Sequence, residues 1–160
     1  MTEGLQDLYR EVILDHNRRP RNFRVIEGGR YHEGFNPLCG DRVTVYMAIE
    51  DGVVRDVAFE GQGCAIAKAS ASLMTEALKG LTTDEARRRF ADFQAMVTAP
   101  LEAPVPDLGK LSVLAGVREF PTRVKCASLA WHTAKAVLDG AVAPEGAAGP
   151  GGAAAPVSTE

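Results

Sequence analysis

Three cysteines and one aspartate are the residues in this sequence whose types and placement could support shared chemistry. Cys39 and Asp41 stand two positions apart where an extended segment begins, so their side chains share one face of it. Cys64 lies at an expected helix start, and Cys126 lies in the expected first turn of a later helix. Amino-terminal ends of helices favour thiolate over thiol. Three sulfurs and one carboxylate oxygen that converge on one cation describe a tetrahedral zinc site.

The cysteine spacing also leaves another interpretation open. No C-x-x-C pair is present, although close pairs are the usual zinc signature, and a buried cysteine often packs as a small hydrophobic residue. Three is an odd number, so the cysteines cannot all pair in disulfides. A reduced cytoplasmic protein that uses its thiols for metal binding or chemistry fits this count better.

The three histidines are weaker ligand candidates. His132 lies six positions after Cys126, roughly 240° around a helix, so the two side chains cannot share one ion. We expect a surface or packing role for His132. His16 should lie at the carboxy-terminal end of a helix, where a cation is favoured, and His32 should be solvated in a loop.

Apolar periodicity predicts the elements that must position these side chains. Alternating apolar residues indicate two strands joined by the Asp51-Gly52 turn, and a short further strand is expected near Tyr31. Together the patterns predict an α+β domain: a small antiparallel sheet of about three strands, covered by helices on one face. The expected strands are residues 43–50 and 53–60. The expected helices are residues 64–79, 82–96, 108–117 and 120–140, preceded by a helix whose apolar pattern covers residues 5–13 and which Pro20 stops.

Composition limits the classes of function. The chain has 160 residues, 46% hydrophobic, and a net charge of −3, which suits one soluble domain over residues 1–139. Residues 140–160 are mostly Gly, Ala and Pro and should form a disordered tail. The negative charge argues against a nucleic-acid partner. No apolar run is long enough to cross a bilayer and no secretory signal is visible, so we expect no membrane partner and a cytoplasmic location.

Four segments resemble the SufU family of zinc-dependent sulfurtransferases, which are related to the IscU and NifU-like iron–sulfur scaffolds. They are "LYREVILDHNRRPRNF", "NPLCGDRVTVYM", "FEGQGCAIAKASASLMTEALKG" and "FPTRVKCASLAWHTAKAVL", and the resemblance spans residues 5–138. It implies an IscU-like fold. It also implies that Cys39, Asp41, Cys64 and Cys126 bind Zn²⁺ and that Cys39 is the catalytic sulfur acceptor.

The resemblance further implies a partner and a process. A pyridoxal-phosphate-dependent cysteine desulfurase of the SufS kind would donate persulfide sulfur, and a downstream Suf scaffold complex would receive it indirectly for iron–sulfur cluster assembly. Arg123 matches an arginine that family members carry shortly before the last cysteine, and it would help partner docking. Lys125 is either an ordinary exposed lysine or a cation that keeps the neighbouring thiolate charged.

Two alternatives remain at this point. The first is an IscU-type scaffold that binds iron and assembles a [2Fe–2S] cluster on the same residues. Scaffolds carry a histidine where this chain has Lys125, and their segment corresponding to residues 80–123, between the second helix and the last cysteine, is shorter. Both departures favour the SufU branch. The second alternative is a domain whose zinc only stabilises the fold.

Overall fold

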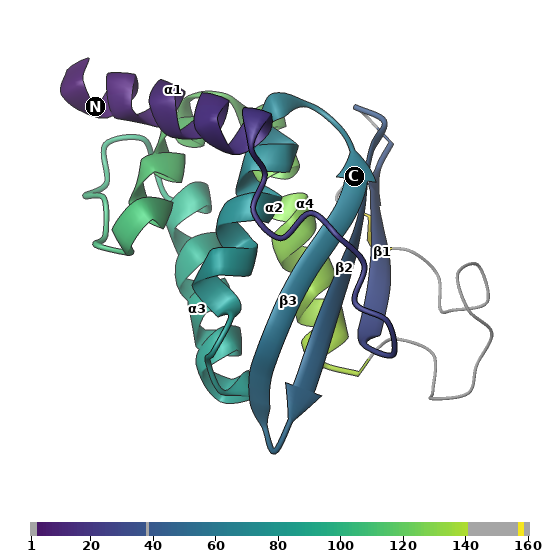
Figure 1. The fold of residues 1–160 in the computed structure, drawn as a ribbon. Coiled ribbons are helices and arrows are strands. Elements are labelled where there is room, and N and C mark those ends of the chain that lie inside the picture. The colour runs from purple at the N-terminus through teal and green to yellow at the C-terminus, as the bar shows by residue number, and fades with distance from the viewer. Residues whose placement is uncertain (1–2, 38, 141–156, 159–160) are drawn as a thin grey trace.

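Among the described residues, a β-sheet forms one layer, and helices cover one of its faces (Figure 1). The computed structural model describes residues 3–37, 39–140 and 157–158. The strands lie in the order β3-β2-β1-β4. β1 pairs with β2, and β2 with β3, in antiparallel fashion, as the sequence predicts, and the short β4 pairs in parallel with β1. The bounds are Arg30–Asn36 for β1, Asp41–Glu50 for β2, Val53–Gln62 for β3 and Val157–Ser158 for β4.

Four α-helices and one 3₁₀ helix complete the described fold. The segment expected as a helix near residues 108–117 is 3₁₀, in keeping with its two glycines and two valines, which lower α-helical propensity. The capping box that Thr82 and Glu85 predict is present at the start of α3. The bounds are Glu3–Arg18 for α1, Ala65–Leu78 for α2, Thr83–Thr98 for α3, Gly109–Glu119 for the 3₁₀ helix η1 and Pro121–Leu138 for α4.

The alternation of β2 places a carboxylate on the core face of the sheet. Val43, Val45 and Met47 point into the core and are at most 6% exposed. Asp41 begins the strand on the same face and is 2% exposed. A charged group in such a position needs partners, because burying an unpaired carboxylate is costly.

α4 packs between the sheet and the other helices, and its tryptophan anchors it. The Trp131 ring stacks on Phe93 of α3 at 4.3 Å between centroids. Its indole N–H donates to the Ser70 hydroxyl of α2 at 3.2 Å, and that hydroxyl donates to the Ala127 carbonyl at 2.6 Å. These contacts fix α2 and α4, the helices that carry two of the three cysteines.

The histidines are more buried than the sequence suggests. The prediction of a solvated His32 is wrong: it lies in β1, 3% exposed, because strand alternation turns it to the core side. His16 is in the last turn of α1 as expected, but it is 2% exposed and its Nδ1 lies 2.7 Å from the Ser72 hydroxyl of α2. His132 has the expected packing role, edge-on against Phe90 at 5.2 Å.

Most of the expected tail lies outside the described residues. Residues 141–156 and 159–160 are not described, so their disorder stays a prediction. The backbone of β4 is described, and it extends the sheet beyond β1. Within the described part of the chain, no helix combines the length and the apolar character needed to cross a membrane.

Candidate metal centre

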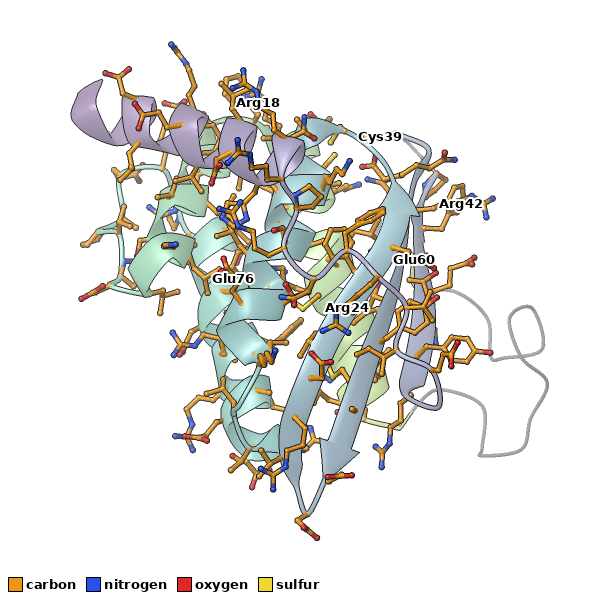
Figure 2. All side chains as sticks on the ribbon, viewed as in Figure 1. Arg18, Arg24, Cys39, Arg42, Glu60 and Glu76 are labelled. Atoms are coloured by element: carbon orange, nitrogen blue, oxygen red, sulfur yellow. The ribbon has the colours of Figure 1, made fainter. Side chains whose placement is uncertain are left out.

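The turn between β1 and β2 presents Cys39. The carbonyl of Asn36, the last residue of β1, accepts hydrogen bonds from the backbone N–H groups of Cys39 at 3.3 Å and of Gly40 at 2.8 Å. Gly40 has φ +73°, a left-handed conformation that favours glycine. Cys39 is exposed at this turn. Figure 2 labels its position at one end of the sheet. The Cys-Gly dipeptide therefore serves both to close the hairpin and to display a thiol.

Asp41 connects that turn to the start of α2. Its Oδ1 accepts a hydrogen bond from the Cys64 backbone N–H at 2.9 Å, and the Cys64 thiol lies 3.8 Å from its Oδ2. The absence of a side chain at Gly63 makes this approach feasible, since a Cβ there would lie 2.8 Å from Asp41 Oδ1. The sequence alone did not predict this close approach of Gly63 to Asp41.

Cys64 is the N-cap of α2, as predicted. Its backbone is extended, and its Sγ accepts from the Ala67 N–H at 3.4 Å. This contact satisfies one of the free N–H groups of the first turn. The thiol is exposed but tied to the helix end.

Cys126 lies deeper than expected. The prediction that it sits in the first turn is wrong, because Pro121 begins α4 and places Cys126 in the second turn. The side chain is 5% exposed. Burial, and then the hydrogen bond with Cys39, raise the pKa of the Cys126 thiol. Because Cys126 lies beyond the first turn of α4, the helix terminus does not account for a thiolate at this residue.

Three of the four predicted ligands converge at this end of the sheet. The ligand atoms of Cys39, Asp41 and Cys126 all lie within 4.8 Å of one another, the one such group found among the described residues. The Sγ atoms of Cys39 and Cys126 are 3.5 Å apart. Two sulfurs bound to one tetrahedral zinc at about 2.3 Å would be roughly 3.8 Å apart. Cys64 lies outside the tightest group but contacts Asp41, so the donor set fits a zinc ion.

Arg123 and Lys125 flank the site on α4. Arg123 is exposed in the first turn, and its guanidinium carbon lies 4.1 Å from the centre of the Phe120 ring. This contact holds the cation near the site without burying it. Lys125 is half-buried beside Cys126. Arg123 also acts on Tyr9 of α1: burial raises the pKa of the Tyr9 phenol, and the nearby positive charge of Arg123 partly opposes that rise.

Comparison with known proteins shows the family of the chain. The family described as "NifU-like N terminal domain" matches residues 8–127, and the chain belongs to this family. It is 41% identical over 128 residues to the zinc-dependent sulfurtransferase SufU of Bacillus subtilis, covering 80% of this chain and 87% of that one. It is 36% identical to the iron–sulfur cluster assembly scaffold protein IscU of Streptococcus pyogenes, covering 84% of each chain.

Solved structures show the same fold. A putative iron–sulfur cluster assembly scaffold protein for the SUF system, from Fervidobacterium islandicum, has a TM-score of 0.75 and 34% identity, covering 83% of this chain and 98% of that one. A NifU-like protein (N-terminal) from Brucella abortus has a TM-score of 0.72 and 28% identity, covering 84% and 94%. The predicted family resemblance and the α+β, IscU-like fold are confirmed.

Proposed function

We propose that this protein accepts persulfide sulfur on Cys39, at a zinc site, from a pyridoxal-phosphate-dependent cysteine desulfurase, and relays it for iron–sulfur cluster assembly. The observation that carries the proposal is the grouping of an exposed Cys39 thiol with buried Asp41 and Cys126 within 4.8 Å. The SufU relative, 41% identical, is a zinc-dependent sulfurtransferase, and this supports the assignment.

The three cysteines differ in how they are held, and this difference supports Cys39 as the acceptor, although Cys64 is exposed too. Cys126 is buried in a helix, and Cys64 caps α2 through its sulfur. Cys39 is exposed in a turn, where a partner can reach it. Cys39, Asp41, Cys64 and Cys126 would hold Zn²⁺, whose charge stabilises thiolates at neutral pH.

The proposed transfer is balanced without any added oxidant. The Cys39 thiolate attacks the outer sulfur of the persulfide on the desulfurase. The sulfur–sulfur bond of the donor breaks, and the donor cysteine leaves as a thiolate. A new sulfur–sulfur bond then forms on Cys39, so the persulfide moves and no net redox change occurs. The sulfur would pass onward to a Suf scaffold complex.

A desulfurase assay with metal analysis of the same sample tests this proposal. Zinc-loaded protein should accelerate cysteine turnover by a SufS-type desulfurase, and Cys39→Ser should abolish the acceleration. The matched control is Ala95→Cys, which adds a thiol at an exposed position of α3, outside the site residues, and should leave the rate unchanged. Equal acceleration by wild type and Cys39→Ser would overturn the choice of acceptor.

A [2Fe–2S] scaffold is the second candidate function, because relatives named IscU scaffold proteins are 36% and 38% identical to this chain. The two functions predict different visible absorption spectra of the protein. Zinc is d¹⁰ and gives no visible absorption, whereas an iron–sulfur cluster absorbs. A visible spectrum of protein purified without oxygen, alongside its iron and zinc content, decides between them.

A further inference from the structure

A groove opens beside the metal centre, between the end of β3 and α2. Its floor is apolar and includes Val43, Phe59 and Leu129. Gly61 and Gly63 leave the wall beside Asp41 without side chains; a Cβ at Gly61 would overlap the Arg42 carbonyl oxygen. The apolar surface of the groove therefore lies next to Asp41, a predicted metal ligand.

Phe23 extends this apolar surface outward. The residues on either side of it pair with β3: Phe59 N–H donates to the Asn22 carbonyl and Arg24 N–H to the Phe59 carbonyl, each at 3.0 Å. The Phe23 ring meets the Phe59 ring edge-on at 5.1 Å between centroids, yet Phe23 stays 43% exposed. An exposed aromatic ring on a fixed backbone is a typical anchor of protein interfaces.

Lys68 places one cation at the rim of the groove, beside Phe23. Lys68 lies one turn after Cys64 on α2, and its Nζ is 5.4 Å from the centre of the Phe23 ring. Arg42 follows the core-facing Asp41 in β2, so its exposed side chain lies on the other face of the sheet, over the Phe35 ring of β1 at 4.8 Å, and does not reach the groove (Figure 2). Lys68 is therefore the cation that this surface offers, and it complements an acidic side chain of a partner.

We propose that Phe23, Lys68 and this groove form the surface on which the sulfur donor lays an extended segment, with one apolar side chain in the groove and one acidic side chain against Lys68. This inference rests on the proposed function. A segment seated there would end at Asp41, two residues from Cys39. The surface would thus set the approach of the donor's persulfide to the acceptor thiol.

Two variants on the surface and two matched controls test the proposal. Phe23→Ala and Lys68→Glu remove the aromatic anchor and reverse the rim charge. Leu101→Ala removes another exposed apolar side chain, 50% exposed, in the loop after α3, and Arg88→Glu reverses an exposed charge on α3. Binding of the zinc-loaded full chain to a SufS-type desulfurase is measured by calorimetry, and transfer kinetics are measured with the same samples.

Each surface variant should raise Kd and KM about tenfold while kcat at saturation stays near the wild-type value. The loss in Lys68→Glu should shrink at high salt, because charge attraction is screened. Both controls should match the wild type, and zinc content should be unchanged in all four. Lys68 makes no ion pair among the described residues, so its replacement should not disturb the fold. If Phe23→Ala proves unstable, the Kd of Lys68→Glu is therefore sufficient to test the docking surface.

Wild-type Kd in both surface variants would overturn the docking surface and leave the proposed function intact. Equal losses in all four variants would also overturn it, because the effect would not belong to this surface. Failure of the wild-type protein to accept sulfur from the desulfurase would instead refute the proposed function.

Discussion

The Asp41 carboxylate accepts a hydrogen bond of 2.9 Å from the backbone N–H of Cys64, 23 residues later in the chain. This bond joins the first residue of β2 to the N-cap of α2. It orients the carboxylate before any cation binds, because one oxygen is fixed while Oδ2 faces the Cys64 thiol at 3.8 Å. A preorganised ligand of this kind strengthens metal binding.

The first prediction concerns metal content. The purified protein should hold one zinc per chain, and Cys126→Ser should lose the metal and unfold more easily. With free metal about a thousandfold above Kd, binding contributes about 4 kcal/mol to stability, which the variant would forfeit. Elemental analysis and urea unfolding with and without chelator measure both effects. Full zinc occupancy in a doubly substituted Cys64→Ser, Cys126→Ser variant would contradict the site.

The second prediction separates the two roles of Asp41. Asp41→Asn keeps an oxygen that can accept from the Cys64 N–H, so the fold should persist while zinc affinity falls. Asp41→Ala also removes that hydrogen bond, so the free energy of unfolding should fall by a further amount of about 1 to 3 kcal/mol. Zinc competition titrations and thermal unfolding measure the two losses. Identical zinc affinity in wild type and Asp41→Asn would show that the carboxylate charge is not used.

The third prediction tests the close approach at Gly63. A methyl group in Gly63→Ala would lie 2.8 Å from Asp41 Oδ1 and must displace the carboxylate. Zinc affinity should fall roughly 10- to 100-fold, the range typical when a ligand loses its orientation. Gln62→Ala, at the neighbouring exposed position, is the control and should bind zinc normally. A normal affinity in both variants would mean that the carboxylate has room to move.

Much of this site could be predicted from residue types and element ends. The β-alternation that buries Val43 and Val45 also carries Asp41 onto the core face, so its placement follows from the local pattern. The N-cap position of Cys64 likewise follows from the preceding glycine and the following alanine-rich run. Such local rules are sufficient to predict where a side chain points when its direction is set by the strand or helix that carries it.

The remaining features depend on how elements pack, which a single sequence does not reveal. Cys126 is buried because α4 begins at Pro121 and is covered on several sides, so its depth could not be deduced from distance to a helix start. His32 is buried because β1 faces α4, although its short, polar sequence resembles a loop. The contact between Gly63 and Asp41 joins two segments and is visible only in three dimensions.

The fourth prediction concerns pH and His16. Burial, followed by the charge of Arg21, lowers the pKa of this histidine, while Glu76 opposes the shift with its Oε1 3.7 Å from Nε2. In the folded chain His16 therefore stays neutral to a lower pH, whereas in the unfolded chain it takes up a proton near pH 6.5. Stability should be full above that pH and decline as the pH falls from there toward the lowered pKa.

Urea unfolding of wild type and His16→Gln at pH 7.5 and pH 5.5 measures this effect. All measurements are made with chelator, so that metal release does not contribute. The wild type should lose more stability than His16→Gln between the two pH values. An equal loss in both proteins would show that His16 does not contribute to the pH dependence.

The most direct test of the account is to locate the transferred sulfur. Zinc-loaded protein is incubated with a SufS-type desulfurase and cysteine, alkylated without reductant, digested and examined by mass spectrometry. The account predicts one added sulfur atom on the peptide that contains Cys39, and none on the peptides of Cys64 and Cys126. Added sulfur on Cys64 or Cys126 instead, or no added sulfur although the desulfurase is active, would contradict the claim that Cys39 is the acceptor.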